Sequence, residues 1–269
     1  MSTRREFLAY GGCAVCAAIG GLSSAQAKTE PVFDGCCISP AGFNGFMKEK
    51  PPMSSALNSS LFARDRHLRT TKDPYVDREL DRAMVLVADL MKVRPAFGFY
   101  EPGIFYNRKD METWPMSAWA SQFDTDIAGT KGTVCFGADL FRKEFYDHDR
   151  TGTTVITIIA HEFAHIAQFN RGYFNDLKTG NTLRRELNAD YLAGYFLGTR
   201  MNQNNKLEFK RAGEYLEREG KSQDGNANRS HGNSKERLDA AERGFRLAYL
   251  QKKTFEQAWV AGLEYVGEK

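Results

Sequence analysis

One short stretch of the chain restricts the possible folds more than any other. An apolar run at residues 155–159 leads directly into Ala-His-Glu-Phe-Ala-His at positions 160–165. Residues four positions apart lie on the same face of a helix, so the imidazoles of His161 and His165 can both reach one metal ion. Glu162 points in another direction, where it can reach a water molecule rather than the ion. We therefore predict a buried helix that carries two metal ligands on one face.

A second amphipathic stretch, residues 184–195, offers a third ligand. A catalytic zinc ion typically takes three protein ligands and keeps its fourth position for water. Glu186 follows His165 by 21 residues, which is enough chain for a turn and a second helix running antiparallel to the first. Glu186 can then be the third ligand. Asp190, one turn further on, can accept a hydrogen bond from the outer nitrogen of a ligand histidine.

Each part of this pattern has a plainer interpretation when it is taken alone. A His pair with a Glu can be a polar patch on a core helix, and a Glu and an Asp one turn apart usually form a solvated face. The apolar run before His161, however, indicates a buried helix, where His and Glu side chains without partners would cost several kcal/mol. Coordination of a metal removes that cost. The combination favours a zinc site.

At this point the sequence resembles a known group of enzymes. The H-E-x-x-H segment followed by E-x-x-A-D at residues 186–190 resembles the gluzincin metallopeptidases. The longer pattern R-x-E-L-x-A-D-x-x-A-G at residues 184–194, with H-G-x-S-x-x-R at residues 231–237, is similar to the bacterial neutral zinc metallopeptidase family. It also resembles the minigluzincins and the M48-type peptidases. The resemblance extends over roughly residues 117–246.

The resemblance implies an α+β fold, namely a mainly helical, zincin-like metallopeptidase domain with a small, mainly antiparallel sheet beside the zinc helix. It implies Zn2+ as the cofactor, held by His161, His165 and Glu186. Glu162 would act as the general base that takes a proton from water and passes it to the leaving amine. A protein or peptide is the substrate that this chemistry predicts.

The resemblance also suggests roles for residues further along the chain. His231 would stabilise the oxyanion that forms during hydrolysis. Arg237 would hold Asp190, a ligand helix or the carboxylate of a substrate, three alternatives that the sequence leaves open. Residues 117–120, Ser-Ala-Trp-Ala, correspond to the N-A-x-A edge-strand motif with Ser117 in place of Asn. In the resembled families, that strand lines the cleft so that the substrate backbone can pair with it.

Residues 1–27 read as an export signal. Arg4 and Arg5, followed by Glu-Phe-Leu, precede a weakly apolar segment, and Ala25-Gln26-Ala27 is a small-residue cleavage site. The paired arginines favour the twin-arginine type, with an ordinary secretory signal as the alternative. We expect the chain to engage the twin-arginine export machinery and to be periplasmic or secreted in a bacterium.

Charge and cysteine content restrict the function further. The formal net charge is only +3, with basic and acidic residues interspersed, so nothing favours nucleic acid as a partner. After the signal, the chain has no apolar stretch long enough to span a membrane. The expected mature chain keeps Cys36, Cys37 and Cys135, which allows at most one disulfide, between Cys135 and one of the other two, or else three thiols.

Composition and periodicity predict the remaining elements. Residues 28–72, rich in Pro, Gly, Ser and Asn, predict an irregular segment before a metallopeptidase-like domain at 73–269. Short β-prone runs occur at residues 97–100, 104–106, 117–121 and 132–136. Helices are predicted from Pro74 to about Arg94, at 138–146, from a cap at Thr151 or Thr153 to Asn170, through residues 184–200, at 207–219, from a cap at Ser234 to about Lys252, and after a capping box at Thr254.

The sequence as a whole predicts an exported zinc metallopeptidase that hydrolyses peptide bonds. Two alternatives remain. The chain could be an amidase that acts on cell-wall peptides, or a non-catalytic cell-envelope binding or assembly factor stabilised by zinc. The presence of Glu162 favours catalysis, because a structural zinc site has no need for a general base.

Overall fold

The computed structural model of the protein describes residues 66–68, 74–101, 117–122, 129–173, 182–203, 207–221, 224 and 231–267. The predicted signal, Cys36, Cys37, the β-prone run at 104–106 and most of the Gly/Asn-rich segment before His231 lie outside these residues. Cys135 is buried, and the disulfide prediction stays untested.

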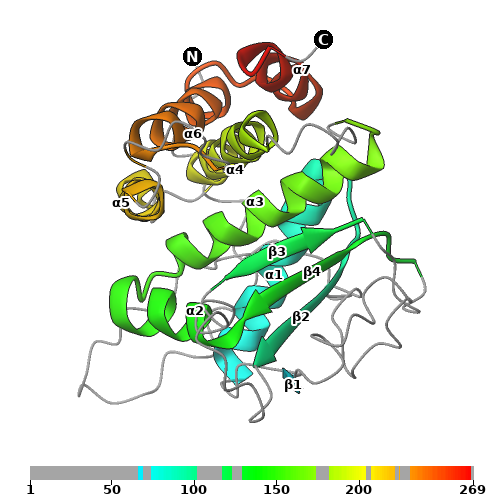
Figure 1. Ribbon diagram of the computed structural model, residues 1–269, viewed down its shortest axis with the longest axis vertical. Coiled ribbons are helices and arrows are strands. Elements are labelled where there is room, and N and C mark those ends of the chain that lie inside the picture. The colour runs from blue at the N-terminus through cyan, green and yellow to red at the C-terminus, as the bar shows by residue number, and fades with distance from the viewer. Residues whose placement is uncertain are drawn as a thin grey trace, which may run out of the picture.

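A four-stranded sheet forms one layer, in the spatial order β1-β2-β4-β3 (Figure 1). The strands are β1 (Arg66–Leu68), β2 (Ala96–Glu101), β3 (Ala118–Ser121) and β4 (Thr133–Gly137). The two outer pairings are antiparallel, and the central pairing of β2 with β4 is parallel, with Phe97 opposite Val134. The sheet is therefore mixed, and β3 lies at one of its edges.

Aromatic side chains join the sheet to the helix that follows it. Phe97 and Phe99, two residues apart in β2, point to the same face. Their rings lie 5.5 Å apart, and the Phe97 ring lies 6.4 Å from that of Phe163 in helix α3 (Thr153–Asn170). Phe97, Phe99 and Phe163 are almost completely buried. This contact fixes α3 across one face of the sheet.

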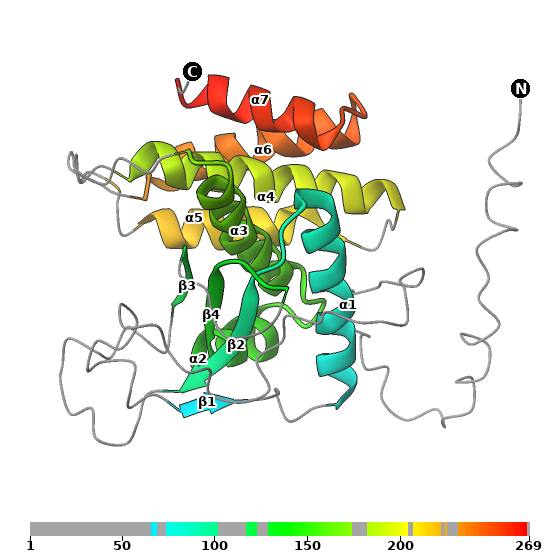
Figure 2. The same ribbon diagram turned by 90° about the vertical axis from the view of Figure 1, so that its right-hand side faces the viewer.

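Two helical segments complete the layer around α3. Helix α1 (Pro74–Met91) packs beside α3 and buries Leu80, Met84 and Val87 (Figure 2). Helix α2 (Ala138–Arg142) follows β4 directly and continues into a π-helix, η5 (Lys143–His148). The predicted start of α1 is confirmed.

A second helical layer covers the side of α3 away from the sheet (Figure 1). It consists of α4 (Leu183–Gln203), α5 (Phe209–Gly220), α6 (Ser234–Tyr249) and α7 (Phe255–Tyr265). Helices α4 and α6 cross so closely that a Cβ on Gly244 would lie 1.8 Å from the carbonyl oxygen of Tyr191, and one on Gly194 would lie 1.9 Å from that of Ala241. Only glycine fits at these two positions.

Salt bridges tie the last helix to the first layer. Glu256, in the first turn of α7, accepts hydrogen bonds from Arg171 at 2.8 and 2.9 Å and from Lys92 at 3.0 Å. The hydrogen bonds from Arg171 and Lys92 lower the pKa of Glu256 to about 2. This contact joins the ends of α1, α3 and α7 at the surface.

Helix α3 begins differently from the prediction. The residue at its N-cap is Gly152, with φ at +78°, a left-handed conformation that glycine adopts without strain. The carboxylate of Asp149 accepts a hydrogen bond from the Thr154 backbone at 2.8 Å, and the Thr151 hydroxyl accepts a longer one, 3.3 Å, from Thr153. The prediction that Thr151 or Thr153 is the cap residue is therefore wrong, because an aspartate earlier in the chain reaches the first turn.

Other element boundaries also differ between the prediction and the structure. The N-cap of α6 is Asn233, which forms a capping box with Glu236, so the predicted cap at Ser234 is wrong by one residue. The capping box at Thr254 is confirmed, with Gln257 as its partner. Strand β1 lies inside 28–72, which was predicted to be irregular, and pairs with β2.

The predicted α+β class is confirmed at this level: helices predominate and the sheet is small. Two of the three strand pairings are antiparallel, but the central one is not. Among the described residues, no helix combines the length and the apolar character needed to cross a membrane.

Candidate metal centre

Helices α3 and α4 bring three ligand atoms together in the interior. The Nε2 atoms of His161 and His165 are 3.1 Å apart. Oε2 of Glu186 lies 3.3 Å from Nε2 of His161 and 3.4 Å from Nε2 of His165. The three side chains are at most 11% exposed. They are the group of described residues with the spacing needed to hold a metal ion.

The spacing of these atoms can be compared with real coordination geometry. Bonds of about 2.0 to 2.1 Å arranged as a tetrahedron place the ligand atoms about 3.3 Å from one another. The observed separations of 3.1, 3.3 and 3.4 Å match this value. Three protein ligands leave one tetrahedral position for a water molecule or a substrate. The three side chains therefore fit a tetrahedral metal ion such as zinc, with its fourth coordination position left open.

Asp190 and Arg237 support the first histidine. Oδ1 of Asp190 lies 2.8 Å from Nδ1 of His161, as the sequence predicted. Arg237 donates two hydrogen bonds to the Asp190 carboxylate, from Nε at 2.8 Å and from a terminal nitrogen at 2.9 Å. Of the three predicted alternatives for Arg237, the structure shows the contact with Asp190.

Charges in this chain of contacts set the protonation of its members. Burial alone would raise the pKa of Asp190, but the guanidinium of Arg237 and the neighbouring His161 together outweigh burial and hold that pKa below its usual range. Burial lowers the pKa of His161, but the carboxylates of Asp190 and Glu186 outweigh it and raise the pKa to about 10. The surroundings of His161 therefore favour positive charge, which a proton or a metal ion can supply.

Gln168 supports the second histidine, a contact that the sequence analysis missed. Its Oε1 lies 2.8 Å from Nδ1 of His165, while its Nε2 donates to the Arg185 carbonyl and to Oδ1 of Asn188. Gln168 is completely buried. The signal was present in the sequence, because a polar residue three positions after a ligand histidine lies on the same face of the helix.

Glu162 is the acidic residue between the two histidines, and one of its carboxylate oxygens accepts no hydrogen bond from the described residues. It is 6% exposed, and its Oε2 atom is buried with no hydrogen-bond partner among the described residues. Burial raises the pKa of Glu162, although the two neighbouring histidines oppose the shift. A buried carboxylate oxygen without a partner costs stability. The free oxygen and the raised pKa of Glu162 suit a carboxylate that takes up a proton.

His231 reaches the centre from the loop before α6. Its Nδ1 lies 3.1 Å from Oε2 of Glu186, and its side chain is 57% exposed. The next residue, Gly232, has a φ of +82°, and a Cβ there would come within 3.0 Å of the Leu187 side chain. The glycine therefore allows the turn that brings His231 over Glu186.

A cavity of about 370 Å³ opens beside the three candidate ligands. Residues 117–120, from strand β3 and the residue before it, form one wall. Tyr215, Leu216 and Glu219 of α5 also line it, as does Arg185. Strand β3 is an edge strand of the described sheet, as predicted for this stretch. The sequence did not indicate Tyr215 or Arg185 as site residues, because neither belongs to a recognisable spacing pattern.

The structure brings all the predicted site residues to this centre. They are His161, Glu162, His165, Glu186, Asp190, His231 and Arg237. In comparisons with known proteins, no family model, curated protein or solved structure matches the chain.

Proposed function

We propose that this chain is a zinc-dependent metallopeptidase of the gluzincin type that hydrolyses peptide bonds in proteins or peptides. The observation that carries the proposal is the combination of a three-ligand group with tetrahedral spacing and a buried, unengaged carboxylate next to it. A site that served only to stabilise the fold would not need Glu162 in that state. This favours an enzyme over a zinc-stabilised binding or assembly factor.

Zinc suits the ligand set better than the other common metals. Two imidazoles and one carboxylate with an open fourth position are typical of catalytic zinc, whereas Mg2+ and Ca2+ prefer oxygen ligands in larger number. The contacts of Asp190 with His161 and of Gln168 with His165 would fix the ring orientations. When bound, the zinc ion supplies a Lewis acid that acidifies water and polarises a carbonyl group.

The protein's own residues would then move protons and hold charge. Glu162, whose pKa burial raises, is the group that takes a proton from the attacking water and returns it to the leaving amine. His231, with Nδ1 over Glu186, is the donor available to the oxyanion at the exposed side of the centre. Leu216 and Leu140 add apolar side chains to the wall of the cavity.

The cavity suits an extended peptide. Strand β3 pairs with β4 on one side, and its other side is the sheet edge next to the metal ligands. A peptide backbone that paired with this edge would lie across the cavity, with a carbonyl group near the centre. Together with the predicted signal at residues 1–27, this supports substrates outside the cytoplasm.

Two measurements test the proposal. The purified chain should contain about one zinc ion per molecule, and Glu186→Ala should lose it, because a ligand is removed. Glu162→Gln keeps the size of the side chain but not its basicity, so it should retain zinc and lose hydrolysis of a library of quenched fluorescent peptides. Glu214→Gln, at an exposed position on α5, is the matched control and should retain both.

The results that would contradict the proposal are equally direct. Full turnover by Glu162→Gln would remove the proposed general base. A wild-type chain that takes up no zinc, or keeps it after Glu186→Ala, would show that the metal centre is misassigned. Zinc binding without hydrolysis of any peptide would favour the non-catalytic alternative.

A further inference from the structure

Arg185 lines the cavity beside the proposed metal ligands, and the described residues use little of the hydrogen-bonding capacity of its guanidinium. A terminal nitrogen of Arg185 lies 3.5 Å from Oε1 of Glu186, which is long for a hydrogen bond. Its Nε is buried and has no hydrogen-bond partner among the described residues. A guanidinium carries five N–H donors. The side chain is 19% exposed, and it adjoins the cavity.

Arg237 shows what a satisfied arginine looks like in the same site. Its Nε and one terminal nitrogen bind both oxygens of Asp190, at 2.8 and 2.9 Å. This paired arrangement is the preferred geometry between an arginine and a carboxylate. Arg237 therefore has its carboxylate within the protein. Arg185 lacks an equivalent partner in the described part of the chain.

We propose that Arg185 binds a carboxylate of the substrate and so makes the enzyme prefer peptides that carry a negative charge close to the scissile bond. This inference rests on the proposed peptidase function and adds a substrate class to it. The carboxylate can be the C-terminus of the peptide or an acidic side chain. The two sources share the chemistry that an arginine recognises.

The position of Arg185 limits how far the carboxylate can be from the scissile bond. Its terminal nitrogen contacts one oxygen of Glu186, and the other oxygen of Glu186 faces the two histidines. One extended residue spans about 3.5 Å. A peptide carbonyl at the centre would thus place a carboxylate at Arg185 only from within about two residues. The preference should therefore disappear when the charge is moved further along the peptide.

The other polar side chains around the cavity agree with this location. His231 contacts Oε2 of Glu186 and Arg185 contacts Oε1, so these two side chains flank the Glu186 carboxylate. The additional acidic residue in the cavity wall, Glu219, belongs to a different helix, α5. A substrate carboxylate is therefore better placed at the α4 side of the cavity than at the α5 side.

The experiment measures binding, so that it does not depend on turnover. The zinc-loaded full chain with Glu162→Gln is immobilised and offered pentapeptide libraries without acidic side chains, in which the free acids and isotope-labelled amides are mixed equally. Mass spectrometry of the retained peptides gives the ratio of acid to amide. We expect retention to favour the acid by about tenfold or more, the size of one charged hydrogen bond. A second amidated library with a fixed Asp tests the side-chain source.

Three variants in the same background assign any preference to Arg185. Adding Arg185→Met should bring the ratio close to one, and adding Arg185→Lys should keep part of the preference, because lysine keeps the charge but not the paired geometry. Adding Arg184→Met is the matched control. Arg184 is the neighbouring exposed residue, and it bonds to the Val266 carbonyl outside the cavity. This variant removes the same charge and should keep the preference.

The outcomes separate the inference from the proposed function. Retention of peptides with equal affinity for acid, amide and Asp libraries would overturn the role of Arg185 and leave the peptidase proposal intact. A preference that survives Arg185→Met would also overturn it. If the chain retains no peptide from any library and the wild type hydrolyses none, the proposed function fails, and this inference fails with it. Zinc content, measured for each variant, shows whether a lost preference reflects a lost metal.

Discussion

Arg237→Met should destabilise the protein strongly, because it removes the cation that pairs with a buried carboxylate. Asp190 is completely buried and accepts two hydrogen bonds from Arg237, at 2.8 and 2.9 Å. Removing one partner of such a pair costs about 3 to 5 kcal/mol. His161 remains beside Oδ1 of Asp190 and keeps part of the stabilisation. We therefore expect a loss of about 3 kcal/mol, a large part of the stability of an ordinary domain.

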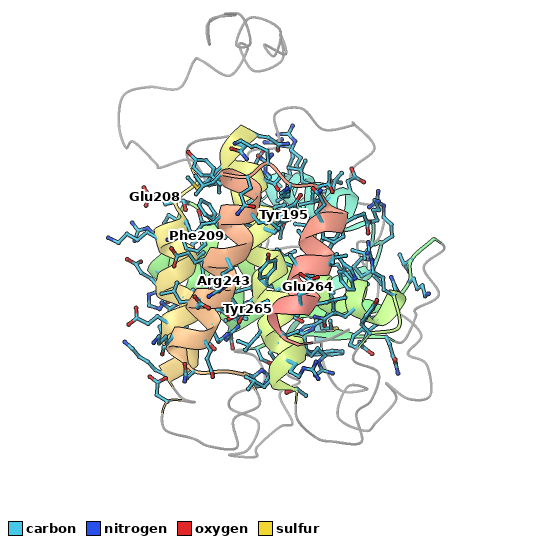
Figure 3. All side chains as sticks on the ribbon, turned by 90° about the horizontal axis from the view of Figure 1, so that it is seen from above. Tyr195, Glu208, Phe209, Arg243, Glu264 and Tyr265 are labelled. Atoms are coloured by element: carbon cyan, nitrogen blue, oxygen red, sulfur yellow. The ribbon has the colours of Figure 1, made fainter. Side chains whose placement is uncertain are left out.

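The loss should be measured by urea unfolding of the metal-free protein, so that metal binding does not contribute to the free energy. Arg243→Met is the matched control on the same helix. Arg243 pairs with Asp239 at 2.8 Å, but it is 57% exposed and lies over the ring of Tyr265 on the outer surface (Figure 3). An exposed pair is worth about 1 kcal/mol or less. The two substitutions remove the same group from different surroundings.

A loss below about 1 kcal/mol for Arg237→Met, or one equal to that of Arg243→Met, would refute the reasoning about the buried pair. Adding Asp190→Asn to Arg237→Met tests the cause. If the unpaired negative charge is responsible, the second substitution should recover part of the lost stability, because a neutral amide costs less to bury. If it recovers nothing, the loss comes from packing.

Three further predictions concern other parts of the fold. Gln168→Ala removes the Nδ1 partner of His165 and should weaken zinc binding about tenfold to hundredfold in a chelator competition. The pKa of Glu256, about 2, lies below its ordinary value of 4.5, so its salt bridges stabilise the fold above about pH 5 and are lost towards pH 2. The melting-temperature difference between wild type and Glu256→Gln should therefore shrink over that range; a constant difference would contradict the assignment. Gly244→Ala should lose about 3 kcal/mol in urea unfolding, and Gly213→Ala, where the nearest atom is 3.2 Å away on a side chain, much less.

Local signals in the sequence predicted well which side chains come together at the candidate metal centre, because helix geometry fixes their arrangement. The spacing of His161 and His165 determines that they share a face, and the apolar run before them indicates burial. The assignment of Glu186 required a further signal, because a separation of 21 residues from His165 permits a return helix without fixing its register. Its assignment depended on Asp190 one turn later, and the contact of Asp190 with His161 agrees with that reasoning.

The features that the sequence did not reveal depend on contacts between distant segments. Asp149 reaches the first turn of α3 because Gly152 takes a left-handed conformation, which no local preference for a threonine cap could indicate. Strand β1 is only three residues long and gains its place by pairing with β2. The sequence does not distinguish Arg185 from a surface arginine, and only the structure shows that it lines the cavity. Such positions follow from the assembled fold rather than from spacing.

The close crossing of α4 and α6 also bears on the order in which the centre can form during synthesis. The last of the three ligands, Glu186, leaves the ribosome 51 residues before Arg237. Until α6 packs against α4, with Gly244 at the close contact, Asp190 lacks its hydrogen bonds from Arg237, and the His161 ring beside it lacks that support. A chain that stopped short of α6 would contain all three candidate ligands but not the arginine that holds Asp190. The full set of contacts at the candidate metal centre therefore forms only when the polypeptide is nearly complete, late in translation or after it.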